Sequence, residues 1–182
     1  DNLIILINDP VQLKSFSLTK EEKNYVKKCY NTKQKSFAIN QYDRWVFVQV
    51  LRDCKESARK AANTLHTSIV GNKISEVSVI NAMGNQAVAF AFSEGLALSN
   101  YQFLKYFKDA KNKTNTLKSI YAQSKDISKE QLLELNAIVE ATFWARDIVN
   151  EPVSFLNAEE LSNQIVEMGK KANFKVEVLD QI

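Results

Sequence analysis

Short apolar runs alternate with amphipathic segments along most of this chain, and the alternation restricts the fold more than any other feature of the sequence. Strands are predicted where β-branched and aromatic residues dominate, over residues 3–8, 35–40, 44–51, 75–81, 116–122 and 174–179. Apolar residues at helical spacing predict helices over residues 20–30, 54–70, 85–107, 128–149 and 157–172. Such alternation is typical of an α/β fold with helices packed on a mostly parallel or mixed sheet.

Local signals at the helix ends support these boundaries. Capping boxes, in which an N-cap side chain and a Glu or Gln three residues later bond each other's backbone, are predicted for Thr19 with Glu22, Ser128 with Gln131, and Asn157 with Glu160. Gly71 is expected just beyond the end of helix 54–70, at the C′ position that favours glycine. Cys54 begins the same helix and is interpreted as a small core residue.

Pro152 divides the last part of the chain. Proline has no backbone N–H and pushes Glu151 out of helical geometry, so helix 128–149 must end near Asn150. The chain beyond Pro152 is interpreted as a separate unit with its own hydrophobic core. We therefore expect an N-terminal domain (1–126), a linking helix (127–150) and the start of a second domain (151–182). The residues Arg146, Asp147, Asn150 and Pro152 are interpreted as an interdomain joint.

Bulk properties exclude several classes of protein. The 182 residues suffice for one domain with a sizeable core, and the net charge of +3 does not by itself indicate a nucleic-acid or membrane partner. Apolar runs are too short to span a membrane. The first ten residues, DNLIILINDP, lack the basic region of a secretory signal and an initiating Met, so we expect a trimmed or engineered start and a cytoplasmic location. Cys29 and Cys54 are interpreted as free thiols.

No catalytic or metal-binding group is predicted in this chain. Only four glycines are present, none of them clustered, so a glycine-rich phosphate loop is excluded. His66 is the single histidine, and no His, Cys or carboxylate lies three or four positions from it, so we interpret it as structural rather than as a general base. Acidic pairs such as Glu159–Glu160 lie in first helical turns, where they stabilise the helix dipole.

One basic segment is a weak candidate for nucleic-acid binding. Residues 101–118 contain five lysines and one aspartate, interleaved with aromatic residues. Lysines and aromatic rings together can hold a phosphate backbone or stacked bases, and the candidates are Lys105, Lys108, Lys111 and Lys113. The alternative is that the aromatic rings pack inward while the lysines solvate the end of a helix and its loop.

Two segments of the chain together resemble the leucyl aminopeptidases (cytosol aminopeptidases). The first, FSEGLALSNYQFLKYFKD at 92–109, has the family's Glu-Gly-Leu run followed by a small polar residue, Tyr, Phe and a lysine-rich tail. The second has ARDIVNEP at 145–152, LNAEEL at 156–161 and KVEVLD at 175–180, in the order and spacing of that family. The region before residue 85 matches only in the order of its elements.

The resemblance implies a three-layer, macro-like N-terminal domain, a long linking helix, and the helix and strand that begin a catalytic domain. Family members act on peptides with two divalent metals, manganese or zinc, and are typically cytoplasmic homohexamers. Their catalytic and metal-ligand motifs are absent from this sequence. We therefore expect a portion of such an exopeptidase that itself has no cofactor and no peptidase activity, and that serves assembly and access to the active site.

A second interpretation stays open: a stand-alone macro-like module that binds nucleic acid or a nucleotide. Macrodomains bind ADP-ribose through glycine-rich loops, and the corresponding loop here, residues 81–85, contains only Gly84.

Overall fold

The computed structural model describes residues 1–122 and 127–179. The chain divides into two compact units, which we call the sheet unit (Asp1–Val139) and the C-terminal unit (Glu140–Ile182). The division falls within helix α5 (Lys129–Asn150), which ends at Asn150 as Pro152 predicts. The domain boundaries expected from the sequence stay a prediction.

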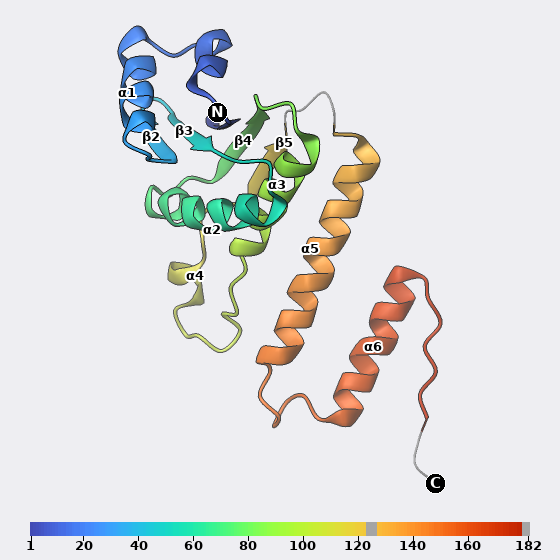
Figure 1. The fold of residues 1–182 in the computed structure, drawn as a ribbon. Coiled ribbons are helices and arrows are strands. Elements are labelled where there is room, and N and C mark those ends of the chain that lie inside the picture. Colours follow the sequence, from blue (N-terminus) through green and yellow to red (C-terminus); the bar gives the residue numbers. More distant parts are fainter. Residues whose placement is uncertain (123–126, 180–182) are drawn as a thin grey trace. The chain divides into compact units, whose positions relative to one another are not determined.

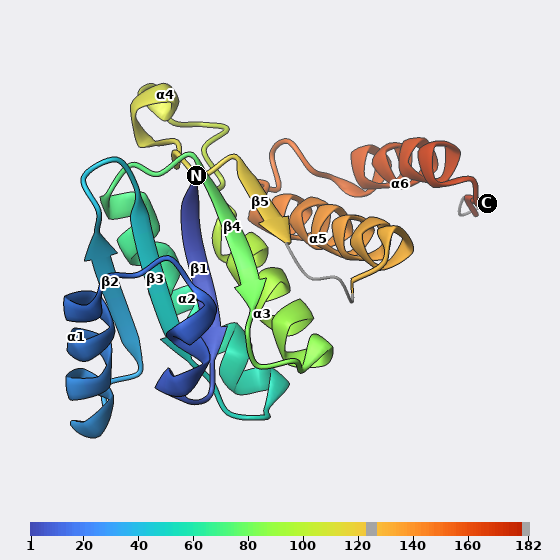
Figure 2. The same cartoon turned by 90° about the horizontal axis from the view of Figure 1, so that it is seen from above.

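A five-stranded mixed sheet forms the centre of the sheet unit (Figure 2). Its strands are β1 (Asn2–Ile7), β2 (Ser36–Asn40), β3 (Trp45–Val50), β4 (Glu76–Asn81) and β5 (Ser119–Ala122), in the order β2-β3-β1-β4-β5. The central strand β1 pairs in parallel with β3 and β4, so that Ile4 lies opposite both Phe47 and Val79. Edge strand β2 is antiparallel to β3. The α/β fold class with a mixed sheet is therefore confirmed.

Helices cover both faces of this sheet and make the sheet unit three layers deep (Figure 1). Successive strand residues point to opposite faces. Ile4 and Leu6 pack in the core under α2 (Lys55–Gly71) and α3 (Gln86–Ser99), whereas Ile5 and Ile7 pack under the 3-10 helix η1 (Pro10–Ser15) and α1 (Lys20–Asn31). These side chains are almost wholly buried. The continuous apolar run of β1 is explained by burial on both faces.

Helices α2 and α3 approach each other closely at Gly95. A Cβ at Gly95 would lie 2.7 Å from the Arg59 Cα of α2, so the contact requires a residue without a side chain. Beside it, the Arg59 guanidinium binds the Glu94 carboxylate through Nη2 at 2.7 Å and Nε at 2.8 Å. The Glu-Gly-Leu run thus has a packing role.

Three predicted details at helix ends are wrong. Gly71 is the last residue of α2, and the left-handed conformation belongs to Lys73, with φ 55°. Cys54 is the N-cap of α2 and is exposed, because the stripe that α2 buries begins at Ala58. The capping boxes at Thr19 and Ser128 are confirmed, but the third is only half formed. Asn157 accepts a bond from the Glu160 N–H, while the Glu160 carboxylate binds Gln164 instead.

Two predicted elements also differ. The helix expected to reach residue 107 ends at Ser99, because the Asn100 side chain bonds His66 at 3.0 Å and the Leu117 carbonyl at 2.8 Å and so draws the chain away. Residues 174–179 are not a strand, since a strand exists only by pairing and no described strand pairs with them. The sequence analysis also missed η1, which Asp9 and Gln12 cap, and the short helix α4 (Ala110–Lys113).

Within the described parts of the chain, every helix is too short or too polar to cross a lipid bilayer.

Candidate functional site

The C-terminal unit is two helices with almost no core of their own. It contains the end of α5 and helix α6 (Ala158–Ala172), and among its described residues only Gly169 is fully buried. Large apolar side chains are instead exposed: Val149 at 83%, Val153 at 84%, Phe155 at 61% and Leu179 at 85%. Folded domains bury most of their large apolar side chains in a core, and the described part of the C-terminal unit buries few of its own.

The predicted joint is a tight turn between these two helices. The Glu151 N–H donates to the Asp147 carbonyl at 3.0 Å and continues the α5 pattern by one residue. The carbonyl of Pro152 then accepts from Phe155 at 2.9 Å and Leu156 at 3.0 Å. The Asn150 side-chain amide also donates to the Arg146 carbonyl at 2.8 Å, one turn back in the same helix. That Arg146, Asp147, Asn150 and Pro152 form an interdomain joint stays a prediction.

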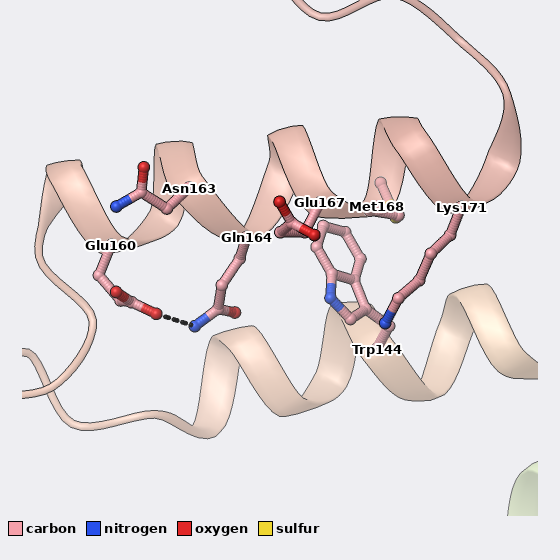
Figure 3. A pocket seen from close by; sticks show the side chains of 7 residues that line it. All are labelled: Trp144, Glu160, Asn163, Gln164, Glu167, Met168 and Lys171. Carbon is pink, nitrogen blue, oxygen red and sulfur yellow. Dashed lines mark hydrogen bonds between the residues drawn. The ribbon is translucent and has the colours of Figure 1, made fainter.

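A shallow groove of about 260 Å³ lies between α5 and α6 (Figure 3). The groove is lined by Trp144 of α5 and by six residues of α6, namely Glu160, Asn163, Gln164, Glu167, Met168 and Lys171, of which Glu167, Met168 and Lys171 lie beside the Trp144 ring. The volume is below the range of about 300–1,000 Å³ that is usual for small-molecule sites.

The carboxylates of this groove are engaged with neighbours on α6. Glu160 accepts from Gln164 at 3.0 Å, as Figure 3 shows. Glu167 binds Lys170 at 2.6 Å, and this hydrogen bond and charge lower the pKa of the Glu167 carboxyl. Two separately occupied carboxylates are not arranged for acid and base chemistry on one substrate. The groove therefore gives no indication of an active site.

The chain leaves α6 through a left-handed residue and then runs extended. Asn173 has φ 58°, and the Phe174 N–H bonds the Gly169 carbonyl at 2.9 Å. A Cβ at Gly169 would lie 2.5 Å from a methyl group of Val176, so the segment after α6 lies directly against this glycine. Residues 174–179 therefore lie beside α6 as an extended segment that pairs with no described strand.

The four lysines proposed for nucleic-acid binding lie around a loop and the short helix α4. Lys113 forms an ion pair with Asp109 at 3.2 Å and lies over the Phe107 ring, 4.4 Å from its centroid. Lys105 lies over the Tyr106 ring at 5.6 Å. Lys108 and Lys111 are exposed. The rings of Tyr106 and Phe107 are about half exposed, and a lysine lies over each ring, so these two rings are not packed fully inward. Nucleic-acid binding stays a prediction.

His66 has the structural role expected of it. It is 9% exposed, and its Nε2 lies 3.0 Å from the Asn100 Oδ1. Because the Asn100 amide nitrogen donates to Leu117, its oxygen accepts, and the proton therefore resides on His66 Nε2. Cys29 and Cys54 are both free. No group of three or more metal-ligating side chains occurs within residues 1–122 and 127–179.

Comparison with known proteins reveals similarity to one kind of enzyme. The chain is 32% identical over 107 residues to a probable cytosol aminopeptidase of Clostridium perfringens, covering 56% of this chain and 22% of that protein. It is 35% identical over 135 residues to a probable cytosol aminopeptidase of Rhodococcus opacus, covering 70% and 25%. No family model matches the sequence. The chain thus spans about a quarter of the length of these curated relatives.

Solved structures show the same fold over nearly the whole chain. A mutant of tomato leucine aminopeptidase superposes with a TM-score of 0.70 at 10% identity, covering 94% of this chain and 40% of that one. The bottromycin maturation enzyme BotP in complex with Mn superposes with a TM-score of 0.68 at 16% identity, covering 95% and 37%.

Proposed function

The chain is a relative of the leucyl aminopeptidases, as its two resembling segments predicted, and from this premise we propose that it is a non-catalytic N-terminal portion of a two-metal exopeptidase. In this proposal the chain contributes to assembly and to access to an active site, while other polypeptide performs hydrolysis. The products would be peptides shortened by one N-terminal residue. The relationship is supported by sequence identity to the probable cytosol aminopeptidases, and the fold agrees.

The observation that carries the proposal is the missing core of the C-terminal unit. Residues 140–179 contain two well-formed helices, yet Val149, Val153 and Leu179 are more than four-fifths exposed. A pair of helices of this length is not stable without buried apolar area. The relatives are about four times longer than the matched part, so a catalytic portion is the natural polypeptide to cover this surface. We assign the extended residues 174–179 to the same interface.

The expected metals, manganese or zinc, would be bound outside this chain. The described residues do not fit such a site, because they bring no three His, Cys, Asp or Glu side chains together. The two carboxylates of the α5–α6 groove do not form such a site either, because Glu160 is bonded to Gln164 and Glu167 to Lys170. When bound, two divalent metals would polarise a peptide carbonyl and supply hydroxide. A cytoplasmic homohexamer is the assembly we propose for the whole enzyme.

The test compares the chain alone with the chain extended by whatever its gene encodes after Ile182. Both proteins are assayed with a leucine chromogenic substrate and Mn²⁺. We expect no hydrolysis by the chain alone, and metal-dependent hydrolysis by the extended protein. The proposal is overturned if the chain alone hydrolyses the substrate. It is equally overturned if translation stops at residue 182 and the 182-residue protein has a protected, stably folded C-terminal unit.

A further inference from the structure

A cavity of about 650 Å³ lies at the edge of the sheet where the parallel strands β1 and β3 end. Asn8 and Arg52 follow these strands, Lys33 to Lys35 belong to the loop before β2, and Ser57 and Ala61 come from the first turns of α2. Ligands of open α/β sheets bind outside the carboxyl ends of the strands. The volume is within the range of small-molecule sites and exceeds what a single inorganic ion requires. We call it the β3 cavity.

The β3 cavity is lined by positive charge alone. Lys33, Lys35 and Arg52 line it, and no Asp or Glu does. None of the three forms an ion pair with any residue in the described part of the chain. Arg59, in the same unit, is by contrast paired with Glu94. A concave surface with charge of one sign focuses its field and attracts a ligand of the opposite sign.

A buried glutamine provides the second feature. Gln49 is 4% exposed and lies on the face of β3 that carries Phe47 into the apolar core. Its Nε2 donates to the carbonyls of Lys35 at 3.0 Å and Val50 at 3.2 Å, which fixes the orientation of the amide. No described residue donates a hydrogen bond to its Oε1. Gln49 lines the cavity, so this amide oxygen is a hydrogen-bond acceptor that a molecule in the cavity can use.

We propose that the β3 cavity binds a small organic anion that also carries a hydrogen-bond donor. Its phosphate or carboxylate group contacts Lys33, Lys35 and Arg52, and its hydroxyl or N–H group donates to Gln49 Oε1. The cavity belongs wholly to the sheet unit, so this binding is independent of peptide hydrolysis and of whatever covers the C-terminal unit.

The test titrates the full 182-residue chain with three related probes, followed by calorimetry and by backbone amide shifts. Glycerol 3-phosphate carries a phosphate and hydroxyls, glycerate a carboxylate and hydroxyls, and glycerol only hydroxyls. We expect saturable binding of at least one of the two anions and none of glycerol, with backbone amide shifts confined to the residues that line the cavity. The stronger anion identifies the anionic group. Absence of saturable binding of both anions, or shifts elsewhere, overturns the proposal.

Matched variants separate a site from general attraction to a basic protein. Lys33→Gln, Lys35→Gln and Arg52→Gln are combined, and the control combines Lys14→Gln, Lys20→Gln and Lys27→Gln, which remove the same charge from lysines outside the cavity. We expect the cavity variant to weaken binding by about tenfold or more and the control to change it less than about twofold. Equal weakening by both variants contradicts a specific site.

A single variant tests the role of the glutamine. Gln49→Met keeps the length of the side chain and removes its amide oxygen. We expect weaker binding of the hydroxyl-bearing anion and unchanged binding of inorganic phosphate, which does not need that acceptor. The sheet content of the variant is checked by circular dichroism. If the folded Gln49→Met protein binds the hydroxyl-bearing anion as tightly as the parent protein does, Gln49 does not take part in recognition.

Discussion

The sheet unit and the C-terminal unit contain helices of equal local quality but differ in what those helices bury. Helix α1 is capped by Thr19 and α6 by Asn157, and each carries acidic residues in its first turn. Val26 of α1 is fully buried against the sheet, whereas the one fully buried residue of α6 is Gly169. Capping and amphipathic spacing therefore produce a helix in both units, and only one unit has a surface for that helix to pack on. The difference supports our proposal that another polypeptide completes the C-terminal unit.

The largest expected difference between the two units is in the protection of their backbone amides against hydrogen exchange. Amides of β1 and β3 should exchange only through global unfolding, which corresponds to about 5–15 kcal/mol of protection. Amides of α6 should open with a small fraction of that free energy, because no buried apolar side chain restrains the helix. Exchange monitored by NMR or mass spectrometry on the 182-residue chain measures both. Equal protection of α6 and β1 would show that the C-terminal unit is stable alone and would break the comparison.

The loss in free energy of unfolding on truncating an apolar side chain should differ almost as strongly between the units. Phe47 is fully buried, and Phe47→Ala should lower the free energy of unfolding by about 3–5 kcal/mol. Val153 is 84% exposed, and Val153→Ala should change it by less than about 0.5 kcal/mol. Urea denaturation followed by circular dichroism gives both values. A loss above about 1 kcal/mol in Val153→Ala would reveal a contact that the C-terminal unit makes within this chain.

Two glycines form a smaller matched pair. Gly95→Ala should cost about 1–3 kcal/mol, because the added Cβ meets the Arg59 backbone of a packed helix. Gly169→Ala should leave the main unfolding transition unchanged, since the obstacles are Val176 and the carbonyl of Phe174 in the extended segment, which can move. Gly71→Ala is the control, because nothing lies within 4 Å of the added atom. Thermal unfolding ranks the three, and a Gly169→Ala loss equal to that of Gly95→Ala would contradict the comparison.

The smallest expected effect concerns pH at the surface of α6. Lys170 lowers the pKa of the Glu167 carboxyl in the folded protein. The contribution of this charge pair to the stability of α6 is therefore present above the ordinary glutamate pKa and is lost as pH falls through the lowered pKa. Lys170→Gln should raise the pKa of Glu167 toward its ordinary value, which NMR titration of the side-chain carboxyl detects. The midpoint for unfolding of the sheet unit should not change. A shifted midpoint would show that the charge pair of α6 is coupled to the sheet.

Much of the local structure could be predicted because its causes are local. The hydrogen bonds at Thr19 and Ser128 connect residues three apart, and the end of α5 follows from the missing N–H of Pro152. Strands β1, β3 and β4 were predicted within one residue, because their apolar runs show burial on both faces. The end of α3 was not predictable in this way, since His66 and Leu117, which hold Asn100, are far from it in sequence.

The candidate sites also differ in whether their causes are local in the sequence or depend on residues far apart in it. The single histidine and the lack of a glycine cluster are properties of the sequence, and from them we predicted no His-based catalytic site and no glycine-rich phosphate loop without coordinates. The β3 cavity could not be predicted, because its lining comes from segments near residues 8, 33, 50 and 57 that only the sheet brings together. Gln49 carries no signal in the sequence, since a glutamine in a strand usually faces water.

By itself, the amino-acid sequence determined the capping boxes at Thr19 and Ser128, the end of α5 and the positions of the central strands, and it showed to which enzymes the chain is related. Only the tertiary structure decided the strand order, the close approach at Gly95, the exposure of Cys54 and the unpaired state of residues 174–179. The physical reason is the range of the interactions. Caps and prolines act within one helical turn, whereas strand pairing, close packing and cavities depend on partners that the chain brings from a distance.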